Sequence, residues 1–232
     1  RTYYGITCLM QISTRDQDYI VDTLLLRDEL NQLNEVFCNP DIVKVLHGAF
    51  MDIIWLQRDF GLYIVGLFDT YHASKSLGFK KNSLAFLLSH YVNFDAAKQY
   101  QLADWRQRPL TPELLSYARS DTHFLLYIFD MLRNELVSRN KIQHVLEESR
   151  KVALRRFENN TYRPDVFSSD VYSVLEKSKP WVHLARNYYI PEKWDPLVEA
   201  IFKWRDQVAR SEDESPRYIM SNQFLLKLVT DR

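Results

Sequence analysis

The sequence predicts an α/β domain followed by a linker and a small all-α module. Two short β-prone runs near the amino terminus, residues 4–12 and 18–25, flank a polar link and are typical of a hairpin. From about residue 111 onward, apolar residues recur at helical spacing. Residues 159–180 lose this periodicity and gain Pro, Ser and Asn, which is typical of a linker.

The other elements of the first domain follow from local pattern. Residues 42–46 form a third β-prone run, and residues 50–60 are expected to form a helix after Gly48. A further short strand is expected at residues 66–68. These strands precede the helices, so the sheet is predicted to lie in the first part of the chain.

The clearest helix begins at Thr111, a good N-cap, with Pro112 at the first helical position. Its apolar spacing continues to Leu132, which predicts one long helix, and a second is expected over residues 141–157. Beyond the linker, two amphipathic patterns predict helices, and a third helix is expected to start near the end of the sequence; together they predict the helical module. These lie at residues 181–188, at about 195–210 and near Asn222.

Composition limits the class of protein. Hydrophobic residues make up 46% of the chain, yet no run of about 18 apolar residues predicts a membrane span. The net charge of zero argues mildly against a nucleic-acid binder. That objection weakens for a carboxylate site whose bound metals supply the positive charge. Cys8 and Cys38 have apolar neighbours and are expected to be reduced core thiols, a disulfide being the alternative.

Asp121 is the first candidate site residue. On the predicted helix it shares a face with apolar or aromatic residues at positions 114, 117, 118, 125 and 128. A carboxylate in an apolar stripe is costly unless it is paired or binds a metal. Tyr117 lies one turn earlier and can direct its hydroxyl into the same pocket. The alternative is a core aspartate that accepts from a donor such as His123 or an arginine.

Asp52 is the second candidate. It follows the predicted strand at residues 42–46 and lies in the first turn of the next helix. Open α/β sheets place their sites beyond the carboxyl ends of strands. The alternative is a carboxylate that only complements the helix dipole. Together, two carboxylates and a tyrosine suit metal-assisted phosphoryl transfer, with Asp69 and Asp104 as further candidate acids, although Asp69 could equally be a cap residue.

Three segments carry a family resemblance. They are HGAFMDIIWLQRDFGLYIVGLFDT, QLADWRQRPLTPELLSYARSDTHFLL and DESPR. The chain resembles the RNase D family from Tyr3 to about Leu228, and within it the 3′→5′ exoribonucleases associated with the eukaryotic nuclear exosome. The resemblance implies an RNase H-like exonuclease domain over residues 1–158, a linker over 159–189, and the first part of a helicase-and-RNase-D C-terminal (HRDC) domain over 190–232.

The resemblance also implies a DEDD site, in which four acids hold two divalent metal ions, Mg²⁺ or Mn²⁺. The third acid falls on Asp52 and the fourth on Asp121, so both are expected to hold metal. Tyr117 is expected to position or activate the attacking water. His47, Trp105 and Arg106 are weaker candidates for lining the site or touching RNA, and Trp105 could simply be a core residue.

The first two acids of the pattern, an Asp-x-Glu pair on the first strand, would lie just before Arg1. We therefore expect this sequence to be a window on a longer polypeptide, with the amino-terminal strand and part of the HRDC domain outside it. A chain that begins at Arg1 would lack two ligands and a core strand.

The resemblance implies a metal-dependent 3′→5′ exoribonuclease that acts on RNA with a free 3′ end and releases nucleoside 5′-monophosphates. It implies the nuclear exosome core and its cofactor proteins as partners, and the nucleus and nucleolus as the location. One alternative is a catalytically inactive RNA-binding or scaffold module of the same fold, favoured by the missing acidic pair. A third possibility is a DNA-proofreading exonuclease, against which the helical second domain argues.

Overall fold

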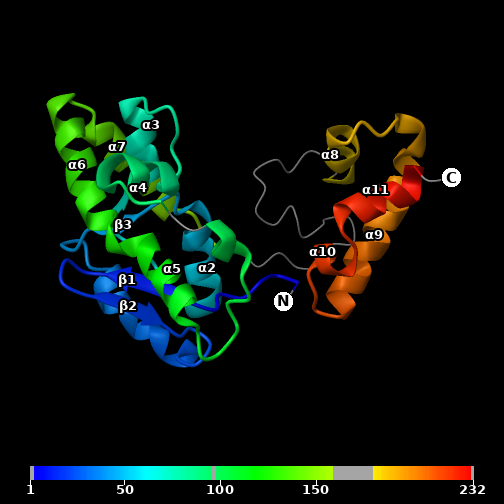
Figure 1. Cartoon of the computed structure of the whole chain (residues 1–232), viewed down its shortest axis with the longest axis horizontal. Coiled ribbons are helices and arrows are strands. Elements are labelled where there is room, and N and C mark those ends of the chain that lie inside the picture. Colours follow the sequence, from blue (N-terminus) through cyan, green and yellow to red (C-terminus); the bar gives the residue numbers. More distant parts are fainter. Residues whose placement is uncertain (1–2, 96–97, 159–179, 231–232) are drawn as a thin grey trace. The chain divides into compact units, whose positions relative to one another are not determined.

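The computed structural model describes residues 3–95, 98–158 and 180–230 (Figure 1). The chain divides into two compact units. One is Thr7–Phe157, and the other joins Arg1–Ile6 to Glu158–Arg232. The first unit contains all the strands of the described residues, and the second contains helices.

The strands of the first unit form two separate two-stranded sheets. Strand β1 (Met10–Ser13) pairs antiparallel with β2 (Asp18–Val21), and the turn between them closes with a 2.8 Å hydrogen bond from Thr14 N–H to the Gln17 carbonyl. Strands β3 (Lys44–Leu46) and β4 (Leu67–Asp69) pair in parallel. The predicted hairpin and the two later strands are confirmed, although each strand is shorter than its β-prone run.

Helices occupy most of the first unit. They are η1 (Arg27–Leu33), α1 (Asn34–Phe37), α2 (Phe50–Phe60), α3 (Thr70–Leu77), α4 (Leu84–Val92), η2 (Lys98–Leu102), α5 (Pro112–His123), α6 (Leu125–Ser138) and α7 (Ile142–Ala153). Helix α2 has the predicted bounds, because the turn after β3 starts it and Gly61 ends it in the left-handed conformation that glycine adopts without strain. The helix expected over residues 141–157 is α7, which is shorter.

Two apolar cores hold this unit together. The first lies around α2 and joins Met10 of β1, Ile53 and Phe60 of α2, and Leu67 of β4. The second joins Phe68 of β4 to helices α3, α4, α6 and α7. Because neighbouring residues of β4 point to opposite faces, Leu67 and Phe68 enter different cores.

The prediction of one long helix after Thr111 was wrong. Thr111 does cap α5, its hydroxyl accepting from the Leu114 N–H, and Pro112 is the first helical residue. The helix ends at His123, however, and α6 starts at Leu125. Helix α5 packs on β1 and β2, whereas α6 packs on α3, α4 and β3. Because of the break at Phe124, the apolar residues of the pattern pack in two places, those of α5 against the hairpin and those of α6 against the helices and β3. The break also places Asp121 in the last turn of α5.

In the second unit, every regular element among the described residues is a helix, as predicted. Its elements are α8 (Pro180–Asn187), η4 (Glu192–Trp194), α9 (Asp195–Ser211), α10 (Pro216–Ile219) and α11 (Asn222–Thr230). Their core includes Trp181, Val198, Phe202 and Leu225. Tyr3 belongs to this unit, because its hydroxyl donates to Asp206 of α9 at 2.6 Å. The first β-prone run forms a strand only from Met10.

Three further expectations concern the linker, the thiols and the membrane. Residues 159–179 of the expected linker lie outside the described residues, whereas the residues of that linker from Pro180 to Asn187 form α8. Neither Cys8 nor Cys38 is part of a disulfide, but Cys38 is exposed, so placing it in the core was wrong; it lies in the loop after α1. Within residues 3–95, 98–158 and 180–230, every helix is too short or too polar to traverse a lipid bilayer.

Candidate metal and nuclease site

Asp52 is presented by the connection between β3 and α2. The strand ends at Leu46, Gly48 turns the chain with a φ of 62°, and α2 begins at Phe50. Asp52 therefore lies in the first turn of α2, beyond the carboxyl end of β3, as the sequence predicts. This is the part of an open α/β sheet where ligands bind.

Asp69 holds this connection in place. It caps α3, and its carboxylate accepts hydrogen bonds from three backbone N–H groups, those of Gly48 (2.7 Å), Ala49 (2.9 Å) and Tyr71 (2.9 Å). The residue is only 1% exposed. Of the two possibilities that the sequence left open for Asp69, the structure therefore favours the cap. A carboxylate already committed to three donors is a poor additional metal ligand.

The carboxylate of Asp52 differs sharply from that of Asp69. No residue that the structure describes donates a hydrogen bond or forms an ion pair with it, although the residue is half-buried. Burial, and after it the negative charge of Asp69, raises the pKa of Asp52 to about 6. The folded chain thus holds a carboxylate close to another negative charge without a compensating cation.

Asp121 has the same character. Within the described ranges no donor or cation contacts its half-buried carboxylate, and burial raises its pKa to about 6. The donor considered from the sequence, His123, is turned away, because its Nδ1 lies 2.8 Å from a carboxylate oxygen of Asp18. Tyr117 lies one turn earlier and is also half-buried. Burial, followed by the charge of Asp121, raises the pKa of its hydroxyl, which therefore stays protonated at neutral pH.

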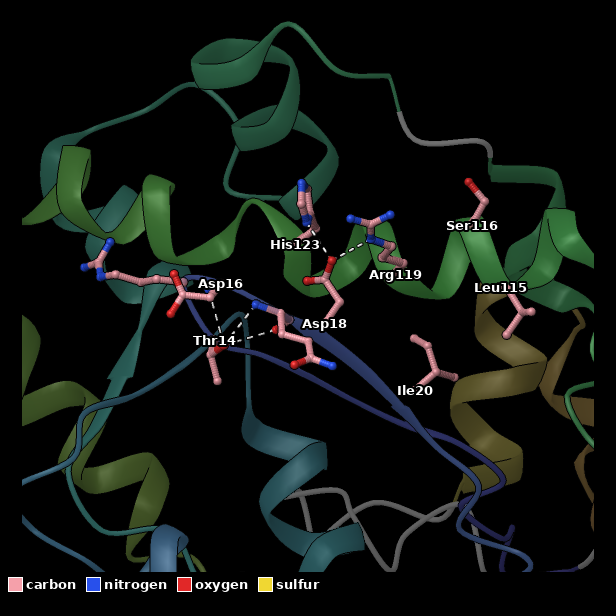
Figure 2. Close-up of a pocket in the computed structure, with 10 residues that line it drawn as sticks. Thr14, Asp16, Asp18, Ile20, Leu115, Ser116, Arg119 and His123 are labelled. Carbon is pink, nitrogen blue, oxygen red and sulfur yellow. Dashed lines mark hydrogen bonds and ion pairs between the residues drawn. The ribbon is translucent and has the colours of Figure 1, made fainter.

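Helix α5 is fixed to the β1–β2 hairpin through another of its faces. Asp18 of β2 pairs with Arg119 and with His123, as Figure 2 shows, and Ser13 of β1 donates to Thr122 at 2.8 Å. Asp18, Arg119 and His123 border an open pocket of about 600 Å³ between the hairpin turn and α5. The pocket includes neither Tyr117 nor Asp121. The hairpin thereby fixes the rotation of the helix that carries these two residues.

The weaker candidates have different surroundings. The Trp105 ring lies 5.9 Å from the ring of Tyr117, and Tyr100 lies at the same centroid distance on the same tyrosine, so Trp105 is placed beside a candidate catalytic group. His47 shares a 2.9 Å hydrogen bond with Thr70, and burial lowers its pKa, which favours the neutral ring. Arg106 is exposed and pairs with Asp104 through two nitrogens.

Asp104 is thus an exposed, ion-paired residue. The structure brings two groups of candidates together. Tyr117 lies near Asp121 and Trp105, and Asp52 lies near Asp69. Asp52 and Asp121 do not contact each other within the part of the chain that the structure describes. Trp55, which the sequence reasoning missed, lies one turn after Asp52 on α2 and is 38% exposed. Its spacing of three residues from Asp52 could have indicated it, because residues at this spacing lie on the same face of a helix. An exposed indole beside the site could stack on a base.

The donor set fits a hard divalent cation. Every other aspartate described as buried or half-buried has a partner; these are Asp18, Asp22, Asp59, Asp69, Asp130, Asp195 and Asp206. Asp52 and Asp121 lack one, and carboxylate oxygen is the ligand that Mg²⁺ prefers. No group of three acidic, His or Cys side chains able to hold a metal is found in the described ranges.

The raised pKa values predict a pH dependence. A carboxylate must be deprotonated to bind metal, so protons compete with Mg²⁺ below pH 6 at both aspartates. We expect the Mg²⁺ affinity to fall about tenfold per carboxylate for each pH unit below 6. Titrating the protein with Mg²⁺ at several pH values between 5 and 8 measures this affinity. A Mg²⁺ affinity that is constant down to pH 5 would show that neither of these carboxylates with a raised pKa binds the ion.

Comparison with known proteins places the chain in a family. A model described as 3′-5′ exonuclease matches residues 1–137, which is more than half of the chain. The chain belongs to the 3′-5′ exonuclease family. A model of the HRDC domain matches residues 195–232. The first domain of the chain is therefore of mixed α/β type, RNase H-like, and is followed by an all-α HRDC domain, which confirms the predicted fold class.

Several relatives of this exonuclease are exosome proteins. It is 62% identical over 229 residues to the exosome complex exonuclease RRP6 of Saccharomyces cerevisiae, covering 99% of this chain and 31% of the yeast protein. It is 46% identical over 236 residues to exosome complex component 10 of Homo sapiens, covering 100% of this chain and 25% of the human protein. The chain thus spans less than a third of these relatives.

A solved structure shares the architecture. The catalytic core of RRP6 from Trypanosoma brucei superposes with a TM-score of 0.78 at 44% identity, over 99% of this chain and 61% of that one. The resemblance predicted from the three sequence segments is therefore confirmed.

Proposed function

We propose that this exonuclease digests RNA from a free 3′ end and releases nucleoside 5′-monophosphates. The observation that carries the proposal is the pair of half-buried, partnerless carboxylates, Asp52 and Asp121, with Tyr117 one turn before the second. Folding leaves both with raised pKa values, and a bound divalent cation would remove that penalty. Membership of the 3′-5′ exonuclease family supports the same assignment.

Each residue has a distinct role in the proposal. Asp52 and Asp121 hold metal, as two of the four acids of the DEDD pattern. Two Mg²⁺ or Mn²⁺ ions would supply the positive charge that stabilises the attacking and leaving oxygens. Tyr117 remains protonated and orients the water that attacks the terminal phosphodiester. Trp105, beside the tyrosine, His47 and Arg106 are proposed to line the site or touch RNA.

The biological setting is proposed from the relatives. Those described above are an exonuclease and a component of the exosome complex. We place this protein with the nuclear exosome core and its cofactor proteins, in the nucleus and nucleolus. Its substrates would then be RNAs that present a free 3′ end to the complex.

The polarity of digestion tests the activity. With Mg²⁺, an RNA ending in a 3′-hydroxyl should be shortened stepwise to nucleoside 5′-monophosphates, whereas the same RNA with a 3′-phosphate should resist, because the terminal nucleotide must enter the site. A 5′-phosphate should make little difference. The measurement is the product ladder over time, with a DNA oligomer of the same sequence alongside. Rapid cleavage of a circular RNA would indicate an endonuclease, and RNA binding without digestion would indicate an inactive module.

A further inference from the structure

A second surface of the nuclease unit lies at the opposite end of the parallel strands. Val43 precedes β3, and Val65 lies two residues before β4, so both are at the amino-terminal ends of the strands. Asp52 and Asp69 lie at the carboxyl ends. A partner bound at the amino-terminal ends would therefore leave the candidate nuclease site open.

This surface exposes apolar side chains that belong to two segments of the chain, α1 with the loop after it and the loop before β4. Five large hydrophobic residues there are between 40% and 54% exposed: Val36, Ile42, Val43, Tyr63 and Val65. We call them, with Cys38, the strand-start patch. Scattered exposed apolar residues are ordinary on a protein surface, whereas a contiguous group indicates an interaction site. The question is therefore whether these residues adjoin one another.

Polar contacts place the two segments that carry them side by side. Val65 N–H donates to the Phe37 carbonyl at 2.9 Å, which places residue 65 beside residue 37, the neighbour of Val36. The Cys38 thiol lies 3.5 Å from the Tyr63 carbonyl. Gly66 has a φ of 70°, and a Cβ added there would lie 3.2 Å from the Ile42 carbonyl. The segment of residues 34–43, which contains α1, is thus packed directly on the loop of residues 61–66.

The charges on this surface have one sign. Among residues 34–44 and 61–67 the charged side chains are Glu35, Asp41 and Lys44. The Lys44 ammonium is turned inward, where it donates to the carbonyls of Val36 (3.4 Å) and Asn39 (2.6 Å). Glu35 and Asp41 are exposed, and neither forms an ion pair with a described residue. The patch therefore presents aliphatic and aromatic groups beside uncompensated negative charge.

We propose that the strand-start patch docks a polypeptide segment that combines apolar side chains with lysine or arginine, carried by another subunit of the exosome complex. The apolar groups would bury Val43 and Tyr63, and the basic groups would meet Glu35 and Asp41. The identity of the partner rests on the proposed association with the exosome, whereas its chemistry rests on the patch itself.

Cys38 provides a test that needs no substitution. Its thiol is exposed within the patch, whereas Cys8 is only partly exposed and lies outside it. Adding purified S. cerevisiae exosome complex that lacks its own RRP6 should slow alkylation of Cys38 at least tenfold and leave the rate at Cys8 unchanged. Peptide mass spectrometry of the intact protein measures both rates. Unchanged alkylation of Cys38 in a complex that has formed would overturn the proposal.

Substitutions give the second arm. Val43→Asp should weaken binding to the same complex at least tenfold, and Glu35→Lys with Asp41→Lys should weaken it most at low salt. The matched control is Leu25→Asp, since Leu25 is 80% exposed and lies outside the patch. Digestion of free RNA should be unchanged in all of them.

The outcomes separate the two proposals. If the unaltered protein and Val43→Asp bind the complex equally, the docking surface is wrong and the association stands. If the unaltered protein digests RNA but does not bind the complex, the association and the docking proposal both fail while the activity stands. If sedimentation shows self-association that Val43→Asp abolishes, the patch joins two copies of this chain and the proposed partner is wrong.

Discussion

Replacing Asp121 by asparagine is expected to abolish RNA digestion while leaving the folded protein as stable or more stable. The substitution keeps the shape of the side chain but removes the charge that would hold metal, and transition-state stabilisation by a metal is worth several kcal/mol. No described donor is lost, because none contacts this carboxylate. The measurements are the digestion rate in saturating Mg²⁺ and the melting temperature of the metal-free protein.

The effect of Asp121→Asn on stability should depend on pH. Because the folded-state pKa is raised to about 6, the folded protein binds more protons than the unfolded chain between about pH 4 and pH 6. Stability is therefore lost as the pH rises through this window. The asparagine variant escapes the loss, so its advantage should be about 1–2 kcal/mol above pH 6 and absent below pH 4.

A surface aspartate provides the control for Asp121. Asp130 pairs with Arg15 at 2.8 Å, so Asp130→Asn should cost a little stability and leave digestion unchanged. If Asp121→Asn instead lowers the melting temperature by several degrees and still digests RNA, Asp121 is a structural residue. The assignment of Asp121 as a metal ligand would then be wrong.

Removing the hydroxyl of Tyr117 is expected to lower turnover by about 10²–10⁴-fold, the usual contribution of a group that orients or exchanges a proton with the reacting water. Tyr117→Phe keeps the ring against Trp105 and Tyr100, so the packing should survive. The affinity for RNA should change little. Single-turnover digestion and RNA binding in Ca²⁺ measure the two quantities separately.

Tyr91→Phe is the matched control for Tyr117→Phe, since it also deletes a hydroxyl. The Tyr91 hydroxyl donates to Glu135 at 2.8 Å, so its loss should cost about 1 kcal/mol of stability and leave turnover unaltered. Equal turnover in wild type and Tyr117→Phe would remove the tyrosine from the mechanism. A large loss in both variants would indicate a general effect on folding.

The sequence by itself determined the local elements and the candidate residues. Thr111 and Pro112 start α5, and Gly61 ends α2, because caps and glycine conformations depend on a few adjacent residues. Asp52, Tyr117 and Asp121 were also identified as candidates from the local sequence. The strand-to-helix position of Asp52 and the apolar neighbours of Asp121 are visible in residue spacing, and the three long motifs identified the family.

Only the tertiary structure decided which carboxylates have partners. Asp52 follows β3 and Asp69 is the last residue of β4. Asp69 accepts hydrogen bonds from Gly48 and Ala49, about twenty positions earlier, while Asp52 accepts from none of the described residues. Likewise, His123 pairs with Asp18 of the hairpin, whereas the sequence spacing had suggested His123 as a donor to Asp121. Periodicity reports which residues share a helix face, but hydrogen-bond partners come from distant segments that meet only when the cores pack. The same long-range packing ended α5 at His123 and exposed Cys38.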